Sequence, residues 1–386
     1  MRSIKDIDVD NKKVLVRVDF NVPLGTNGEI EDDFRIKAHL ETIKYLKEDK
    51  ARTILISHLG KPKGKEQKFS LEGVAKRLSE LLNFEVKFAE DCLGEKAEKE
   101  INNLEAGDVL LLENLRFYPE EEENDKQFAA TLSRMGDIFV EDAFSVCHRN
   151  HASVTGIPQF IPSYAGLLFE KEVFNLQKIN EDPKHPFIVI IGGAKIETKI
   201  GVIEYFLNKA DAVLLGGKIA NEALKLKGLY GTQEVRDKAV FEATRNIDVN
   251  HPKLLTPIDG LIGKMSYSRV GSVDAVREDE DIFDIGPQTI EIYQKIIGMG
   301  KTIVWNGPMG KTEEEVFTKG TKAIADKIGE GNNFSVVGGG ETIDFIHQFK
   351  LEDKFDFLSS GGGAMLEFIS GKELPGILAL NKDYDR

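Results

Sequence analysis

The stretch VLVRVDFNVPL (residues 14–24) is an apolar run that ends in a polar turn. The segment Lys13–Val18, which overlaps its start, predicts a strand buried on both faces, because the apolar run is continuous rather than alternating. The next segment, Asp33–Glu48, predicts a helix, because its apolar residues recur at helical spacing. This order of short strand, turn and amphipathic helix is typical of an α/β protein.

The same order recurs throughout both halves of the chain. In the first half we expect strands at Thr53–Ile56, Val109–Leu112 and Ile138–Val140, and helices at Ser70–Leu82 and Asn124–Met135. In the second half we expect strands at Phe187–Ile191, Ala212–Leu215, Thr302–Trp305, Phe334–Val337 and Phe357–Leu358, and helices at Lys199–Asn208, Gln288–Ile297 and Thr321–Ile328. The pattern predicts two doubly wound, Rossmann-like parallel sheets.

The length of the chain also indicates two domains. Its 386 residues are too many for one ordinary hydrophobic core. A predicted helix at Glu170–Asn180 and the polar segment EDPKHP (181–186) separate the two series of strands. We therefore expect an N-terminal domain at residues 1–165, a connecting hinge helix at 166–185, a C-terminal domain at 186–370 and a tail at 371–386.

Composition excludes several classes of protein. Lys and Arg number 51 and Asp and Glu number 65, a formal net charge of −14, whereas nucleic-acid and anionic-membrane binders need a basic field. Cys92 and Cys147 are too few for a disulfide scaffold and lack the spacing of a zinc site. The first ten residues contain no apolar signal core, and no apolar run approaches the ~18 residues of a membrane span. We expect a cytoplasmic protein without nucleic-acid or membrane partners.

Cations and hydrogen-bonding side chains follow the predicted strands of the first half. They are Asp19, Asn21, Arg35, His58, Lys61, Arg116, His148, Arg149 and His151. Ligands of parallel sheets bind beyond the carboxyl ends of the strands, and Arg binds carboxylates and phosphates bidentately. The set predicts a site for a small, multiply anionic substrate, although any single residue among them is equally well explained as solvated surface.

Glycine-rich turns follow the predicted strands of the second half. They read GGAK (192–195), LGGK (215–218), WNGPMG (305–310), GGGE (338–341) and SSGGGA (359–364). Glycine lets backbone N–H groups approach an anion, and a following helix adds the positive end of its dipole. The turns predict a nucleotide site, but neither the GxxxxGK[ST] nor the GxGxxG motif occurs.

These turns, in this order, resemble the phosphoglycerate kinase family over essentially the whole chain. The likeness is carried by VLVRVDFNVPL, SHLGKPKG, LLENLRFYPEEE, HRNHAS, GGAKIETK, DIGPQT, VWNGPMG, GGGET and LSSGGGAMLEFISGKELPG. The resemblance implies two domains facing a cleft, closure about the hinge helix, and a tail that returns to the N-terminal domain. It implies reversible transfer of a phosphoryl group from 1,3-bisphosphoglycerate to ADP, giving 3-phosphoglycerate and ATP, with Mg²⁺ as cofactor and a monomeric enzyme.

The resemblance also assigns roles to individual residues. The catalytic residues would be Arg35, Lys195 and Lys199. Substrate would be bound by Asp19, Asn21, Arg35, His58, Leu59, Gly60, Lys61, Arg116 and Arg149. The nucleotide would be bound by Lys195, Lys199, Gly216, Gly217, Asn306, Glu313, Gly338, Gly339, Gly340, Glu341, Ser359, Ser360 and Gly361, with Glu341 also contacting the metal.

Four positions depart from the family pattern. Lys61 replaces an arginine, Glu341 replaces an aspartate, Ile282–Phe283 replaces Gly-Leu, and Lys311–Glu313 replaces Val-Phe-Glu. They bear on affinity and nucleotide preference and leave the core of the mechanism in place. The alternatives are another ATP-dependent acyl-phosphate or carboxylate kinase, an anion- or nucleotide-binding module without catalysis and, least favoured, a nicotinamide dehydrogenase.

Overall fold

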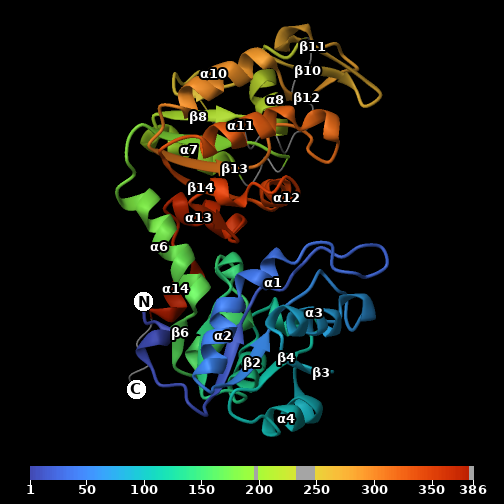
Figure 1. Ribbon diagram of the computed structural model, residues 1–386, viewed down its shortest axis with the longest axis vertical. Helices are drawn as coiled ribbons and strands as arrows, with labels where there is room; N and C mark the ends of the chain where they lie inside the picture. Colours follow the sequence, from blue (N-terminus) through green and yellow to red (C-terminus); the bar gives the residue numbers. More distant parts are fainter. Residues whose placement is uncertain (195–198, 232–247, 382–386) are drawn as a thin grey trace. The chain divides into compact units, whose positions relative to one another are not determined.

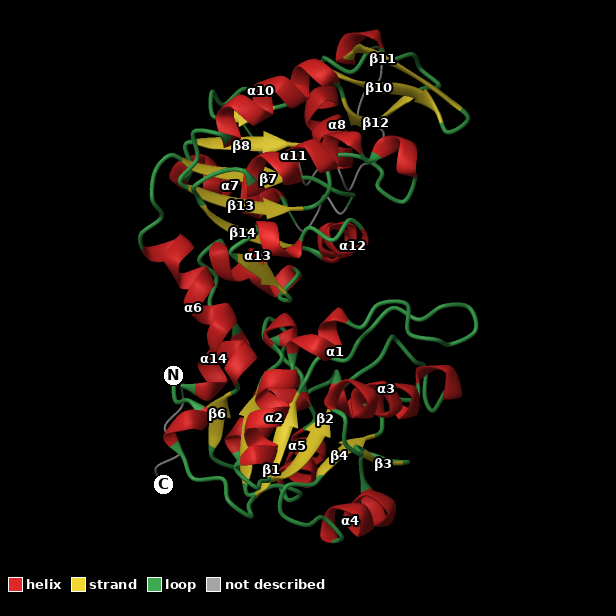
Figure 2. Ribbon diagram, viewed as in Figure 1, coloured by secondary structure: helices red, strands yellow, loops and turns green. Residues whose placement is uncertain are grey.

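The computed structural model describes residues 1–194, 199–231 and 248–381 (Figure 1). The chain divides into two compact units, Met1–Phe174 with Glu373–Arg386, and Asn175–Lys372. Each unit contains a six-stranded sheet in which all strand pairs are parallel (Figure 2). The prediction of an α/β fold built on two parallel sheets is therefore confirmed.

The sheet of the first unit has the strand order β3-β4-β2-β1-β5-β6. Its strands are β1 (Lys13–Arg17), β2 (Arg52–Ile56), β3 (Lys87–Ala89), β4 (Val109–Leu112), β5 (Ile138–Glu141) and β6 (Ser163–Ala165). Its helices are α1 (Phe34–Ala38), α2 (Leu40–Glu48), α3 (Glu72–Leu82), α4 (Gly94–Asn102), α5 (Lys126–Ser133) and α14 (Pro375–Leu380). Helix α6 (Leu167–Glu181) begins in this unit and continues into the sequence of the second.

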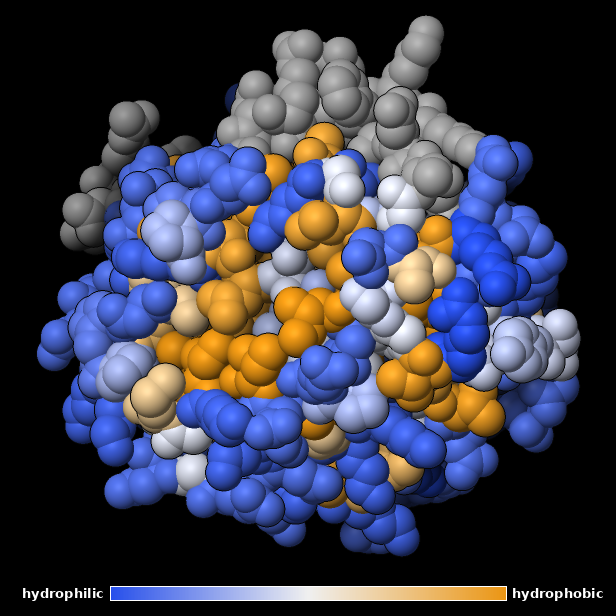
Figure 3. Space-filling view, turned by 90° about the horizontal axis from the view of Figure 1, so that it is seen from above, coloured by the Kyte–Doolittle hydropathy of each residue, from blue (hydrophilic) through white to orange (hydrophobic). Residues whose placement is uncertain are grey.

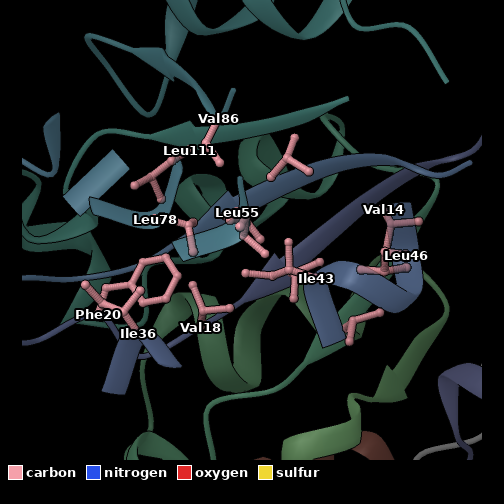
Figure 4. Packing of buried hydrophobic residues seen from close by; sticks show 14 of the residues in the cluster. Val14, Val18, Phe20, Ile36, Ile43, Leu46, Leu55, Leu78, Val86 and Leu111 are labelled. Carbon is pink, nitrogen blue, oxygen red and sulfur yellow. The ribbon is translucent and has the colours of Figure 1, made fainter. Parts of the chain in front are cut away.

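The core of the first unit lies on both faces of its sheet. Val14 and Val16 of β1 belong to a buried cluster with Ile43 of α2 and Leu78 of α3. Figure 4 shows Val14, Ile43 and Leu78 in this cluster. Leu15, between the two valines, belongs instead to a second cluster with residues of α4 and α5. Successive side chains of a strand point to opposite faces, so a strand that serves two cores is apolar at consecutive positions, here Val14, Leu15 and Val16. Helices on both faces are the doubly wound arrangement that the sequence predicts.

The predicted single helix Asp33–Glu48 is wrong in one respect, because the helix is interrupted at His39. The His39 backbone N–H donates to the Ile36 carbonyl at 3.2 Å, three residues back, which ends α1. The His39 ring is held by Asp142 Oδ2 at 2.6 Å. A tertiary contact therefore overrides the helical periodicity that runs across this point.

Helix boundaries also differ from the prediction by one to three residues, and α5 shows a physical reason. Helix α5 begins after Asp125 rather than after Asn124, because Asp125 Oδ1 accepts hydrogen bonds from the backbone N–H groups of Gln127 and Phe128. Asn124 takes a left-handed backbone conformation, with φ of 55°. Both residues are good caps by type, and only the backbone geometry decides between them.

The parallel sheet of the second unit has the order β15-β14-β13-β7-β8-β9. Its strands are β7 (Phe187–Ile191), β8 (Ala212–Leu215), β9 (Leu254–Leu255), β13 (Thr302–Asn306), β14 (Phe334–Gly338) and β15 (Phe357–Ser359). The helices described here are α7 (Ile200–Lys209), α8 (Gly217–Leu226), α10 (Pro287–Ile297), α11 (Lys319–Gly329), α12 (Gly340–Gln348) and α13 (Gly363–Ile369).

Each parallel sheet has a point at which the chain reverses its direction of travel across the strands. In the first unit the chain moves from β1 to β2 on one side and later returns to β5 on the other side of β1. In the second unit β8 and β13 flank β7 in the same way. Loops at such a point diverge and leave a crevice at the carboxyl ends of the strands. Ligand-binding sites are therefore expected at the turns after β1 and β5, and after β7 and β13.

A three-stranded antiparallel sheet in the second unit was not predicted. It has the order β11-β10-β12 and consists of β10 (Asp259–Lys264), β11 (Tyr267–Ser272) and β12 (Asp281–Ile285). Its small core joins Ile262 and Ile282 of the sheet to Leu224 of α8 and Tyr230. Glycines and polar residues interrupt the apolar pattern of these strands. The periodicity of apolar residues therefore does not predict them.

The surface of the molecule is of mixed polarity. Figure 3 shows one face on which apolar side chains gather toward the middle and hydrophilic side chains surround them. Exposed large apolar residues of the second unit include Met265, Tyr267 and Val270. In the part of the chain that the structure describes, no helix combines the length and the apolar composition that a membrane crossing requires.

Candidate active-site residues

Asp19 lies two residues after the end of β1, at the switch point of the first sheet, and is buried. Arg35 NH1 lies 2.6 Å from its Oδ2, and the Ser145 hydroxyl donates to the same oxygen at 2.5 Å. The backbone N–H of Asn21 donates to Oδ1 at 3.1 Å. Burial alone raises the pKa of Asp19, but Arg35 and Ser145 help to hold it well below its usual range. The carboxylate is therefore ionised and fixed in orientation.

His58 presents a buried N–H group without a partner. It follows β2, is 1% exposed, and its Nδ1 lies 3.1 Å from Arg17 NH2. A guanidinium can only donate, so Nδ1 accepts and the ring proton is on Nε2. Burial lowers the pKa of His58 well below its usual value, so the ring is neutral. Among the described residues Nε2 has no hydrogen-bond partner, which indicates a place for an acceptor from a ligand.

The loop after β2 is held by side chains from other segments. Gly60 N donates to Asn21 Oδ1 at 2.8 Å, and Arg116 NH1 donates to Gly60 O at 2.7 Å. The buried Asn114 accepts from Leu59 N at 3.2 Å and donates to Leu59 O at 2.8 Å. At Gly60 φ is 65°, and a Cβ there would lie 2.4 Å from an aromatic ring, so only glycine fits. The loop is therefore preorganised.

Arg116 and Arg149 place two more cations beside these residues, from the loops after β4 and β5. Arg116 Nε lies 2.9 Å from Glu122 Oε1 as an ion pair, but in the described part of the chain neither this Nε nor the buried Arg149 NH1 has a hydrogen-bond partner. Burial and neighbouring arginines lower the pKa of both guanidinium groups, and the same causes lower the pKa of His151 to about 4. Crowded, incompletely paired arginines are typical of a phosphate or carboxylate site.

In the second unit, the turns after β7, β8 and β13 contact one another through their backbones. Gly192 N donates to Asn306 O at 2.9 Å, and Gly217 N donates to Met309 O at 2.8 Å. A Cβ on Gly217 would lie 2.6 Å from Gly193 N. Side chains would separate these turns, so glycine is required for the close approach. Helix α8 begins at this point, with Gly216 as its N-cap.

Lys199 and Glu341 flank the glycine turn after β7. Lys199 directly precedes α7, is 7% exposed, and its Nζ donates to Gly192 O. A Cβ built on Gly193 would lie 3.1 Å from Lys199 Nζ and 3.2 Å from Glu341 Oε2. Glu341 is exposed in the first turn of α12, whose N-cap is Gly339. An ammonium group and a carboxylate thus lie at the same turn.

Asn306 offers a further buried donor at the end of β13. It is 3% exposed, and its Nδ2 has no hydrogen-bond partner among the described residues. A Cβ on Gly339 would lie 3.1 Å from this Nδ2. Ser359, at the end of β15, accepts a hydrogen bond from Gly361 N at 3.1 Å. The N-terminus of α12 lies beside these groups and adds N–H donors with a positive dipole end.

Comparison with known proteins agrees with this geometry. The family model described as phosphoglycerate kinase matches residues 4–372. The phosphoglycerate kinase of Dictyoglomus turgidum is 47% identical in an alignment that covers 98% of this chain and 97% of that protein. That of Pseudothermotoga lettingae is 44% identical and covers 98% of each chain. The chain belongs to the phosphoglycerate kinase family.

Solved structures of phosphoglycerate kinases share the fold of this chain. The crystal structure from Pyrococcus horikoshii matches with a TM-score of 0.90 and 36% identity over 98% of both chains. The structure from Coxiella burnetii matches with a TM-score of 0.82 and 37% identity, again over 98% of both chains. The family inferred from the sequence motifs, and the enzyme class that it implies, are confirmed.

The structure places most of the residues that resemblance to phosphoglycerate kinases assigns to substrate and nucleotide on the loops described above. In the first unit, hydrogen bonds or electrostatic interactions connect Asp19, Asn21, Arg35, His58, Leu59, Gly60, Arg116 and Arg149. Lys61 is exposed at the edge of this set, and Glu313 is exposed on the loop after β13. Lys195 lies outside the described residues. The roles that the resemblance assigns to all of these residues remain predictions.

Several residues that organise these loops were missed from the sequence. Arg17 is 1% exposed and donates to both His58 and the Ser153 hydroxyl. Asn114 and Ser145 hold the loop after β2 and the carboxylate of Asp19. A charged residue inside an apolar strand was the signal for Arg17, since buried charges are rare unless paired. The other two resemble ordinary loop residues in sequence, and no pattern marks them.

Proposed function

We propose that this member of the phosphoglycerate kinase family divides its substrates between its two units. The reaction is the glycolytic one, reversible transfer of a phosphoryl group from 1,3-bisphosphoglycerate to ADP. The first unit would bind the phosphoglycerate and the second the nucleotide. The observation that carries this division is a set of buried donors beside a fixed carboxylate in the first unit. His58 Nε2, Arg116 Nε and Arg149 NH1 have no hydrogen-bond partner among the residues that the structure describes.

In the first unit, each group suits one part of a phosphorylated hydroxy acid. Asp19, an ionised acceptor, would bind the glycerate hydroxyl, and Asn21 would lie beside it. His58 Nε2–H and the guanidinium groups of Arg116 and Arg149 would bind the phosphate and carboxylate. A neutral histidine donates without demanding a counter-charge, so the arginines supply the net positive charge. Lys61 would add a point charge at the exposed edge.

In the second unit, the glycine turns suit a nucleotide. The β- and γ-phosphates would lie near the N-terminus of α12 and the turns at Gly216–Gly217, Gly338–Gly340 and Ser359–Gly361. Asn306 Nδ2 would donate to a phosphate, and the exposed Glu313 would lie near the ribose. Lys199 would neutralise the phosphoryl group during transfer, together with Lys195.

The chemistry requires positioning and charge neutralisation rather than a general base. A β-phosphate oxygen of ADP attacks phosphorus, the bond from phosphorus to the acyl oxygen breaks, and the carboxylate of 3-phosphoglycerate leaves. Both the attacking and the leaving oxygen are ionised at neutral pH, so no proton moves. Arg35 and Lys199 would stabilise the charge of the migrating group. Because the substrates bind to different units, transfer would require closure that also excludes water.

We also propose Mg²⁺ as the cofactor, held by Glu341. In the part of the chain that the structure describes, no group of three or more His, Cys, Asp or Glu could hold a metal ion. This fits Mg²⁺, which is usually bound by one or two carboxylates together with substrate phosphates and water. A bound Mg²⁺ supplies charge neutralisation at the nucleotide phosphates.

A coupled assay tests the proposal directly. Purified protein should form ATP from 1,3-bisphosphoglycerate and ADP, and calorimetry should detect binding of 3-phosphoglycerate and of ADP. Turnover of acetyl phosphate but not of 1,3-bisphosphoglycerate would favour a different acyl-phosphate kinase. Binding without turnover would favour a binding module, and NADH oxidation would favour a dehydrogenase. Glycolysis runs in the cytoplasm, where we propose that the protein acts as a monomer.

A further inference from the structure

His39 joins two loops of the first unit through its buried ring. It is 1% exposed, Asp19 N donates to its Nε2 at 2.9 Å, and its Nδ1 lies 2.6 Å from Asp142 Oδ2. A backbone N–H can only donate, so Nε2 must accept and the ring proton must lie on Nδ1. His39 therefore bridges the carboxylate of Asp142 and the backbone of Asp19.

Asp142 is anchored independently of this histidine. Its Oδ1 accepts from Thr42 Oγ1 at 2.9 Å and from the backbone N–H of Leu168, in the first turn of α6, at 3.0 Å. The carboxylate is fully buried. Bonds to both of its oxygens fix its orientation, and a fixed acceptor in turn allows the imidazole only one tautomer and one orientation.

The ring also contacts the residue that follows Asp19. Phe20 and His39 meet edge to face, with ring centroids 5.6 Å apart and an interplanar angle of 79°. His39 thus holds both the backbone and an adjacent side chain of the turn after β1. The carboxylate carried by this turn contacts Arg35 and Ser145. A shift in the backbone of this turn would therefore displace the groups proposed to bind phosphoglycerate.

We propose that His39 is a positioning residue for phosphoglycerate binding, which acts by fixing the backbone of Asp19. The inference rests on the function proposed for the first unit. His39 would not touch the substrate itself. If its acceptor were removed, the Asp19 N–H would be left buried and unpaired, a costly state that the turn would relieve by moving. Displacement of Asp19 and Arg35 would weaken the binding of phosphoglycerate but not of nucleotide.

Two substitutions separate positioning from mere packing. In His39→Gln, the side-chain oxygen can reach the place of Nε2 and accept the Asp19 N–H. In His39→Leu, the volume is largely retained but no acceptor remains. Thr42→Val is the matched control. It removes a bond to the same Asp142 carboxylate and the bond that Thr42 Oγ1 accepts from Leu167 N, and it leaves the bond to Asp19 intact.

The experiment measures KM for 3-phosphoglycerate and for ATP, the affinity for 3-phosphoglycerate by calorimetry, and the melting temperature. We expect His39→Leu to raise KM for 3-phosphoglycerate by about 5- to 50-fold, with KM for ATP changed by less than about 2-fold. His39→Gln should restore most of the loss. Thr42→Val should lower the melting temperature and leave both KM values close to those of the unmodified protein.

Other results would overturn the proposal. If His39→Leu lowers only the melting temperature, or if His39→Gln and His39→Leu raise KM equally, His39 does not act through Asp19. If His39→Leu does not fold, Asp142→Asn replaces it: an amide that donates to Nδ1 moves the ring proton to Nε2, where it faces the Asp19 N–H. An unchanged affinity for 3-phosphoglycerate in Asp142→Asn would then refute the proposal. Failure of the proposed function is distinct, since the unmodified protein would itself not bind 3-phosphoglycerate.

Discussion

Arg35 NH1 lies 2.6 Å from Asp19 Oδ2, so a guanidinium from the start of α1 meets a buried carboxylate from the end of β1. The Asp19 side chain is 5% exposed and that of Arg35 is 33% exposed. The carboxylate therefore anchors one edge of the guanidinium, while part of the group remains accessible to a ligand. Because Arg carries five donors in a planar fork, an anchored and partly accessible Arg can orient a phosphoryl group.

We expect Arg35→Ala to lower kcat by about 10²–10³-fold, because a cation that acts on the migrating group is lost mainly from the transition state. Steady-state kinetics that separate kcat from KM provide the measurement. Lys37→Ala is the matched control on the same helix, since Lys37 is exposed and pairs with Asp33 at 2.7 Å. A rise in KM with unchanged kcat would show that Arg35 binds only the ground state.

Lys199→Ala tests the equivalent cation of the second unit. We expect turnover to fall by about 10²–10³-fold or more, with the affinity for 3-phosphoglycerate nearly unchanged, because the ammonium group lies at the turn after β7. Turnover by coupled assay and binding by calorimetry measure the two quantities. Lys209→Ala, at the exposed end of the same helix, is the control. Activity within a few-fold of the unmodified protein would remove Lys199 from the mechanism.

The buried carboxyl of Asp284 in β12 should make stability depend on pH. Burial raises its pKa to about 7, although Gly320 N and Ile285 N donate to it. A raised pKa means that the folded state binds the proton more tightly than the unfolded state, so this contribution to stability is full below about pH 4 and is lost as the pH rises to 7. We expect the loss to amount to a few kcal/mol.

Urea unfolding of the unmodified protein and of Asp284→Asn between pH 4 and pH 8 checks this expectation. The Asn side chain does not titrate, so its free energy of unfolding should fall less steeply over that interval. Comparing slopes removes the constant cost of replacing one acceptor oxygen by a donor. Parallel curves for the two proteins would show that Asp284 does not titrate in this range.

The parallel sheets were predictable because of a specific physical requirement. The middle of a strand such as Lys13–Arg17 packs against a core on both faces, so Val14, Leu15 and Val16 form a continuous apolar run that the sequence shows directly. The turns after these strands could be singled out as candidate binding sites. Cations recur in them in the first half of the chain and glycines in the second, and chain geometry alone does not require that recurrence. The antiparallel strands β10 to β12 have no continuous apolar run, and the sequence pattern did not predict them.

Long-range contacts account for what the sequence left out of the site. His39 lies between α1 and α2, where the helical spacing of apolar residues continues, and only its contact with Asp142, more than a hundred residues later, explains the interruption. Arg17 holds His58 across two strands of one sheet. Neither pairing follows from local propensity, because each depends on which loops the strand order brings together.

The last prediction concerns Glu341, whose Oε2 lies 3.2 Å from the place of a Cβ on Gly193, at the proposed phosphate turn. A carboxylate beside bound phosphates is unfavourable unless a cation neutralises it, so we expect Glu341 to contact Mg²⁺ directly or through water. Glu341→Gln keeps the shape and removes the charge. We expect it to raise the Mg²⁺ concentration needed for half-maximal rate, measured by titration at fixed total nucleotide.

Glu341→Asp is the matched control, because it retains the charge with one methylene fewer. It should stay active with only a modest change in Mg²⁺ dependence. The competing explanation is that Glu341, in the first turn of α12, merely interacts with the helix dipole, which is worth about 0.3–1 kcal/mol at an exposed position. In that case Glu341→Gln would lower the melting temperature slightly and leave the Mg²⁺ titration where it was. An unshifted titration would therefore exclude Glu341 from the metal site, whatever happens to stability.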